Sequence, residues 1–279
     1  MAIYYTWIPQ LLPFEWATHI FMQNALLAVL LVTPLFGILG TMVVNNKMAF
    51  FSDALGHSAL TGIAIGVILG MSDPLWAMLA FSILLAIGIS IVKASSTSSP
   101  DTIIGVFSAT AVALGIVILS RSGGFTKYSR FLIGDLLSIS PNELLMLVFL
   151  VLGVLVFWVF MFNQLLLVSI NPSLARSRGS NVRLLEILFS IIMAVIVTIS
   201  IQWVGLLIIN SLLILPAASA RNISHDMRQY HLFSVSIALL SGLAGLLLSY
   251  YWGTATGATI VLCSAAFFLL TLFIKLKSR

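Results

Sequence analysis

The chain has 279 residues, of which 61% are hydrophobic and only 8% are charged, whereas a soluble globular domain carries roughly a quarter charged residues. A soluble fold is therefore excluded, and an outer-membrane barrel is excluded because the apolar runs are too long for short alternating strands. The formal net charge of +5 does not indicate a nucleic-acid partner, since the Lys and Arg residues that orient a membrane protein account for it. The sequence predicts an all-α, polytopic membrane protein.

Apolar stretches follow one another along nearly the whole chain, and each approaches the roughly 20 residues that a helix needs to span a membrane. They lie at about 20–43, 50–71, 74–93, 102–120, 143–162, 184–201, 203–220, 232–250 and 256–274. The turn at 201–205 is very short, so eight spans remain an alternative to nine. Little sequence is left for another domain, and residues 1–279 are predicted to form a single transmembrane domain, a helical bundle.

The basic residues predict the orientation of this bundle. If the C-terminal end and every second connection before it are cytoplasmic, that side holds ten of the thirteen Lys and Arg residues. An excess of Lys and Arg marks the cytoplasmic side of a membrane protein. We therefore expect the N-terminus outside and the C-terminus in the cytoplasm.

Polar residues at the ends of the apolar stretches predict local contacts. Ser99 and Ser140 each precede a proline and an acidic residue, which is typical of a helix N-terminus, and Ser140 with Glu143 forms a capping box. Glu186 is expected to pair with Arg183 near the cytoplasmic boundary.

The stretch SDALGHSALTGIAIGVILG, residues 52–70, places Asp53, His57 and Thr61 on one helix face, because residues four apart are neighbours there. A carboxylate and an imidazole are ligands of zinc, and the same pair suits manganese or iron. An ionisable group in a membrane is costly, and a divalent metal would compensate for that cost. In the alternative interpretation Asp53 is a boundary cap and His57 a hydrogen-bonded packing residue.

A stripe of small residues runs beside this face of the same helix. Small residues spaced by four let two helix backbones approach closely in lipid. The predicted helix-packing residues are Ser58, Gly62, Gly66 and Gly70.

The segment NPSLARSRG, residues 171–179, predicts a helix of about two turns, with Asn171 as its N-cap and Gly179 as its C-cap. So short a helix is marginal in water unless it docks on another surface. A cytoplasmic docking element is one interpretation, and an interfacial turn that anchors basic residues to lipid headgroups is the other. The predicted docking residues are Asn171, Pro172, Leu174, Arg176, Arg178 and Gly179.

Motifs of ATP or peptide hydrolysis do not occur in the sequence. It contains no Gly-x-x-x-x-Gly-Lys phosphate loop, no His-Glu-x-x-His and no nucleophile elbow. The chain is therefore not expected to be an enzyme.

Five segments in the same order resemble a known family. They are KMAFFSDALGHSAL (47–60), DTIIG (101–105), FLIGDLLSIS (131–140), NPSLARSRG (171–179) and VGLLIINSLLILPAASAR (204–221). Together they resemble the membrane permease subunit of bacterial zinc and manganese ABC importers, the ABC-3 family, from about residue 25 to the C-terminus.

The resemblance implies a type II importer permease in the bacterial inner membrane that moves a divalent transition metal into the cytoplasm. It implies a complex of two permease copies, identical or paralogous, with two ATP-binding subunits and an extracytoplasmic metal-binding protein, surrounded by lipid. The permease would hold no permanently bound cofactor. The ligand types do not distinguish zinc from manganese or iron as the transported metal.

The resemblance also assigns roles to two segments. Asp53 and His57 match the family's Asp-Ala-Leu-x-His, which is associated with the translocation path, and residues 171–179 resemble the coupling helix that seats in the ATPase. In one place the chain departs from the family. Residues 253–257, GTATG, lack the acid and the proline of the usual Asp-x-Pro-x-Gly, so no outer carboxylate is expected there.

Two other classes of membrane protein are less consistent with the sequence. An ion-coupled secondary metal transporter is the alternative, but it would typically show inverted repeats and several intramembrane carboxylates, and neither is visible. An intramembrane enzyme would need more than one Asp-His pair.

Overall fold

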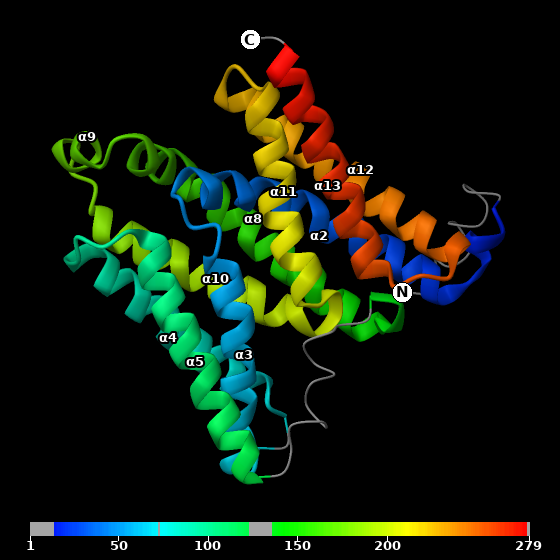
Figure 1. Ribbon diagram of the computed structural model, residues 1–279, viewed down its shortest axis with the longest axis horizontal. Coiled ribbons are helices and arrows are strands. Elements are labelled where there is room, and N and C mark those ends of the chain that lie inside the picture. The colour runs from blue at the N-terminus through cyan, green and yellow to red at the C-terminus, as the bar shows by residue number, and fades with distance from the viewer. Residues whose placement is uncertain (1–13, 72, 123–135, 278–279) are drawn as a thin grey trace. The chain divides into compact units, whose positions relative to one another are not determined.

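The computed structural model describes residues 14–71, 73–122 and 136–277, and within these ranges it consists of helices without strands (Figure 1). The helices are η1 (Glu15–Thr18), α2 (Ile20–Asn45), α3 (Phe51–Ile68), α4 (Leu75–Ser95), α5 (Pro100–Ser122), η2 (Leu136–Ser138), α8 (Pro141–Ile170), α9 (Pro172–Ser177), α10 (Val182–Val204), α11 (Leu206–Ile223), α12 (Met227–Trp252) and α13 (Thr256–Lys277). The predicted all-α class is confirmed. Residues 131–135, the first half of the segment 131–140, lie outside the described residues.

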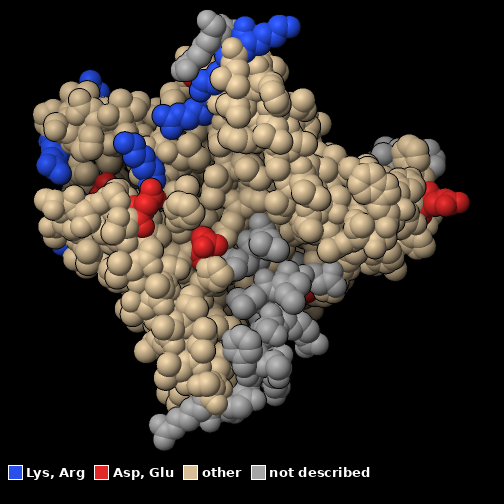
Figure 2. All heavy atoms as spheres, viewed as in Figure 1, with Lys and Arg blue, Asp and Glu red and all other residues tan. Residues whose placement is uncertain are grey.

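The long helices have the composition of membrane spans. Eight described helices are long and apolar enough to cross a membrane, and α11 contributes a shorter apolar helix, Ile208–Ile223. Figure 2 shows a surface largely free of charged side chains, with the basic ones visible near α9 and near the C-terminal end of α13. The prediction of a polytopic bundle with eight or nine spans is confirmed, and the uncertain span is α11.

The chain divides into two compact units. Unit 1 comprises residues 1–41, 135–155 and 203–279, and unit 2 comprises 42–134 and 156–202. Neither unit is one continuous segment, and α2, α8 and α10 each contribute residues to both units. The prediction of a single domain stays a prediction.

In unit 1, α11, α12 and α13 pack on one another (Figure 1). The unit 1 part of α2 comes close to this group through glycines. A Cβ at Gly37 would lie 2.9 Å from the Cα of Val235 on α12, and the hydroxyl of Ser234 donates a hydrogen bond of 2.6 Å to the Gly37 carbonyl. The close approach of backbones is thus reinforced by a polar contact.

In unit 2, α3 packs on both α4 and α5 (Figure 1). On the α5 side, a Cβ at Gly115 would lie 3.0 Å from the Cα of Thr61, and the Thr61 hydroxyl donates to the carbonyl of Ala111. Side chains on other faces of the unit are apolar and exposed, with Val117 67% and Phe160 76% exposed. Such apolar exposure suits lipid contact.

Both predicted helix starts occur in the structure. The backbone N–H of Ser140 donates to Oε2 of Glu143 over 2.7 Å, and the Glu143 N–H donates to the Ser140 hydroxyl over 3.4 Å, which is a capping box. In unit 2, the N–H of Thr102 donates to the hydroxyl of Ser99 over 3.2 Å. These contacts satisfy backbone N–H groups that a helix leaves unpaired.

The predicted pairing of Glu186 with Arg183 is wrong. Glu186 instead forms an ion pair with Lys93, in the last turn of α4, with 3.6 Å between Nζ and Oε1. Spacing along one helix suggested Arg183, whereas the packing of unit 2 brings the end of another helix to the carboxylate.

Candidate functional site

Asp53 and His57 lie in the first two turns of α3 in unit 2. Nε2 of His57 is 3.5 Å from Oδ1 of Asp53, and the two side chains are 42% and 43% exposed. The N-cap position of α3 is occupied by Phe50, which makes no side-chain cap bond. Asp53 therefore lies inside the helix, in the first turn, where the helix dipole favours a carboxylate.

The distance between the two side chains suits a shared metal ion. Two ligands that are each about 2.0–2.2 Å from a tetrahedral zinc ion lie roughly 3.4 Å from one another, close to the observed 3.5 Å. The described residues contain no group of three or more His, Cys, Asp or Glu that could hold a metal ion. The pair alone would leave coordination positions open for water or for ligands from another chain.

The small-residue stripe of α3 faces α4. The hydroxyl of Ser58 lies 3.4 Å from that of Ser82 on α4, and a Cβ at Gly62 would collide with the backbone of Met78. At Gly66, a Cβ would lie 3.0 Å from the Cβ of Ala77. These three positions are next to α4, and there is little room at them for side chains larger than those of glycine and serine.

Gly70 differs from the other residues of the predicted stripe. It lies beyond the end of α3, which stops at Ile68, and nothing lies within 4 Å of the position that its Cβ would take. Its φ of +68° is in the left-handed region that glycine adopts at no steric cost. Gly70 therefore serves the turn after the helix, in contrast to the predicted packing role.

Together, these contacts fix the faces of α3. The stripe of Ser58, Gly62 and Gly66 lies on α4, and Thr61 is held by the carbonyl of Ala111 on α5. Thr61 was predicted on the same face as Asp53 and His57, but it is buried. Asp53 and His57 are thus the accessible polar part of this face, at its N-terminal end.

The segment 171–179 contains α9, with Asn171 as the expected N-cap and with Arg178, instead of the predicted Gly179, at the C-cap position. Oδ1 of Asn171 accepts a hydrogen bond of 3.1 Å from the N–H of Leu174, and Pro172 occupies the first turn. At the other end, Gly179 has φ +80°, and its N–H donates to the carbonyl of Arg176 over 3.0 Å. Gly179 therefore lies one residue beyond the C-cap, at the position where a left-handed glycine commonly follows a helix.

One side of α9 is exposed and the other is buried. Ala175 is fully buried, whereas Leu174 is 42% exposed and Arg176 and Arg178 are exposed as well. Beside the helix lies an open hollow of about 310 Å³, lined by Asn163, Gln164, Leu166, Leu167, Ile170, Arg178 and Ser180. An exposed leucine and two arginines next to a hollow are suited to a protein partner.

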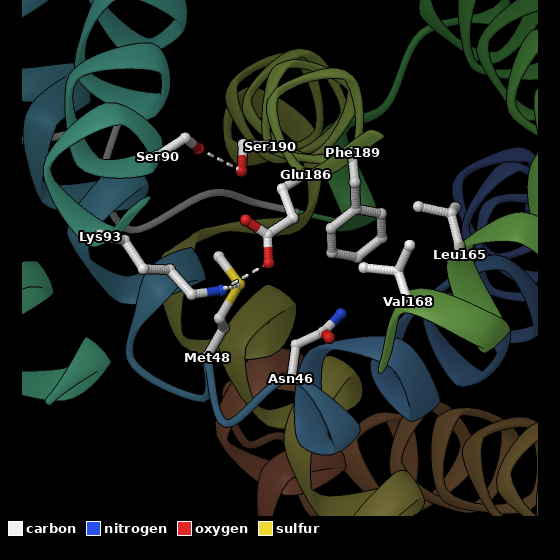
Figure 3. A pocket seen from close by; sticks show the side chains of 9 residues that line it. All are labelled: Asn46, Met48, Ser90, Lys93, Leu165, Val168, Glu186, Phe189 and Ser190. Atoms are coloured by element: carbon white, nitrogen blue, oxygen red, sulfur yellow. Dashed lines mark hydrogen bonds and ion pairs between the residues drawn. The ribbon is translucent and has the colours of Figure 1, made fainter. Parts of the chain in front are cut away.

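A polar cluster at the adjoining ends of α4 and α10 was not expected from the sequence (Figure 3). Its ion pair joins Lys93 to Glu186, and Ser90 donates a hydrogen bond of 2.7 Å to Ser190. Nζ of Lys93 also lies 3.6 Å from the sulfur of Met48. Spacing within one helix gives no signal for these pairs, because their members are far apart in the sequence.

Comparison with known proteins supports the resemblance found in the sequence. The profile of the ABC 3 transport family matches residues 18–275. The chain belongs to the ABC 3 transport family. This match covers α2 to α12 completely and nearly all of α13.

Two curated proteins are similar to the chain over most of their length. The high-affinity zinc uptake system membrane protein ZnuB of Haemophilus influenzae is 34% identical over 84% of this chain and 90% of that protein. The manganese import system permease protein ScaB of Streptococcus parasanguinis is 31% identical over 93% of this chain and 92% of that protein. Among solved structures, PsaBC from Streptococcus pneumoniae in complex with Fab has a chain with a TM-score of 0.78 and 28% identity, covering 98% of this chain and 96% of that one.

Proposed function

We propose that this protein is the permease subunit of an ABC importer that carries zinc or manganese into the cytoplasm. The observation that carries the proposal is the family match over residues 18–275, together with relatives named for zinc uptake and manganese import. Those relatives are named as membrane and permease proteins, so this chain is not itself an enzyme. A separate ATP-binding subunit hydrolyses ATP.

In this proposal, Asp53 and His57 hold the metal during passage. A cation that leaves water needs replacement ligands, and an exposed carboxylate and imidazole 3.5 Å apart supply two of them. A closed four-ligand site would trap the ion, whereas a conducting site must release it. Asp53 and His57 from each of two permease copies would together supply four ligands. Such a site would form when the two copies bring their ligands together and would release the metal when they separate.

The second element of the proposal is α9, which docks on the ATP-binding subunit. Its exposed Leu174, Arg176 and Arg178 would contact the partner, while Asn171 and Gly179 fix its two ends. The complete complex would contain two permease copies, two ATP-binding subunits and an extracytoplasmic metal-binding protein. With α9 and the C-terminus of α13 in the cytoplasm, the N-terminus lies outside, in agreement with the distribution of Lys and Arg.

Uptake in proteoliposomes tests the proposal against ion-coupled secondary transport. The permease is reconstituted with its ATP-binding subunit and binding protein, and radiolabelled zinc and manganese are supplied outside. We expect uptake that requires hydrolysable ATP inside and does not respond to an imposed proton or sodium gradient. Uptake driven by such a gradient in the absence of ATP would contradict the proposal and favour the secondary transporter.

A further inference from the structure

We propose that Lys93 is a positioning residue that links the docking helix α9 to the metal-bearing helix α3, through its ion pair with Glu186. This inference rests on the proposed function, because it assumes that α9 receives the movement of the ATP-binding subunit. All residues in the argument belong to unit 2.

The first link joins α9 to α10 through a turn whose backbone is fixed by hydrogen bonds. The N–H of Ser180 donates to the carbonyl of Ala175 over 3.0 Å. Oδ1 of Asn181 then accepts a bond of 3.1 Å from the N–H of Leu184, in the first turn of α10. Since both sides of the turn are held, a displacement of α9 is passed to the start of α10, where Glu186 lies.

The second link joins α10 to α4 by two contacts about one helical turn apart. Glu186 pairs with Lys93 over 3.6 Å, and Ser190 accepts a hydrogen bond of 2.7 Å from Ser90. The two serines are 2% and 4% exposed, and the Lys93 and Glu186 side chains are 18% and 28% exposed. Two contacts on matching turns hold the helices in register, whereas a single contact would allow them to pivot.

The third link joins Lys93 to the start of α3. Its Nζ lies 3.6 Å from the sulfur of Met48, a residue only 3% exposed, and the Met48 carbonyl accepts a hydrogen bond of 3.0 Å from the N–H of Phe51. Phe51 is the first residue of α3, two positions before Asp53. Figure 3 shows the Lys93 side chain with its amino group beside the Met48 sulfur and a dashed line leading to Glu186.

The Lys93 side chain therefore contacts both the helix that follows α9 and the turn that precedes the metal pair. Charge matters for this role, because removing one partner of a half-buried ion pair leaves the other charge poorly compensated. A neutral side chain at either position would loosen the contact between α4 and α10 without altering α9 or the Asp53 and His57 side chains. Such a variant is expected to hydrolyse ATP with less metal moved for each ATP.

The experiment measures metal transported per ATP hydrolysed in proteoliposomes that contain the full complex. Glu186→Gln and Lys93→Gln should each lower this ratio about threefold or more, the size expected for residues in direct contact. The charge reversal Lys93→Glu with Glu186→Lys should recover most of the ratio, and Lys93→Arg, which keeps the charge, should retain it. Lys277→Gln, which removes a lysine at the exposed end of α13, is the matched control and should be unchanged.

Other results would overturn the inference. If Lys93 and Glu186 only stabilise the fold, the single variants lower the amount of assembled complex while the metal-to-ATP ratio stays at the wild-type value. A charge reversal no better than the single variants would also contradict the ion pair as the coupling contact. The wild-type complex separates this inference from the proposed function, since ATP-driven uptake by the wild type supports the function whatever the variants do.

Discussion

His57 and Asp53 stand one turn apart on α3, with Nε2 3.5 Å from Oδ1. If this pair holds the metal in passage, Asp53→Asn removes the negative charge and His57→Ala removes the imidazole ligand. Each change should abolish most ATP-driven metal uptake, because the remaining ligand cannot replace the lost hydration alone. Radiolabelled uptake in proteoliposomes checks this expectation, with co-purification of the ATP-binding subunit as the measure of assembly.

A polar residue on the exposed side of α5 provides the matched control. Thr110 is exposed and bonds within its own helix, so Thr110→Ala should leave uptake unchanged. If both variants of the pair transported metal at the wild-type rate, Asp53 and His57 would have no role in the path, and the metal would cross elsewhere.

A second prediction concerns the contact between α3 and α4. A Cβ at Gly62 would collide with the backbone of Met78, so Gly62→Val forces the two helices apart. Overpacking of this kind costs about 1–3 kcal/mol, and the variant should unfold at a lower temperature in detergent. Gly105→Ala is the control, since nothing lies within 4 Å of its added Cβ and alanine in a helix is more stable than glycine by about 0.5–1 kcal/mol.

The two glycine variants give opposite expectations in one thermal-unfolding assay. The close contact between α3 and α4 is supported if Gly62→Val lowers the unfolding midpoint temperature relative to the wild type. Gly105→Ala should leave that temperature equal to the wild-type value or raise it. Equal effects of the two substitutions would show that the helices can separate at Gly62 without loss, which is incompatible with the observed packing.

These contacts show why some features could be predicted from the sequence and others could not. Caps such as Asn171 and Ser140 depend on residues within one turn, so local sequence predicts them. The partner of Glu186 depends on which helix ends meet, and Lys93 is far away in the sequence. Gly70 continued the spacing of the stripe, but the helix ends before it, and spacing alone does not fix where a helix stops.

A third prediction concerns orientation. The Lys and Arg distribution predicts that α9 is in the cytoplasm and that residues 121–141 are outside. In a Cys263→Ala background, Ser129→Cys should react with an impermeant thiol reagent added to whole cells, whereas Ser177→Cys should react only after permeabilisation. Cys263 is the only cysteine of the chain, so background labelling is removed by one substitution. Labelling of position 177 from outside would reverse the proposed orientation and remove α9 from contact with an ATP-binding subunit.

The last prediction concerns the two ends of α9. Asn171→Leu removes the oxygen that accepts from Leu174, and loss of such a cap costs about 1 kcal/mol. Gly179→Pro is more severe, because proline cannot adopt the φ of +80° and lacks the N–H that donates to Arg176. Both variants should enter the membrane normally but bind less ATP-binding subunit and show less metal-stimulated ATP hydrolysis. Gly179→Pro should lower both quantities more than Asn171→Leu.

Gly179→Asn is the matched control, since asparagine tolerates the left-handed conformation. Normal co-purification of the ATP-binding subunit with Gly179→Pro would mean that the partner docks on another surface.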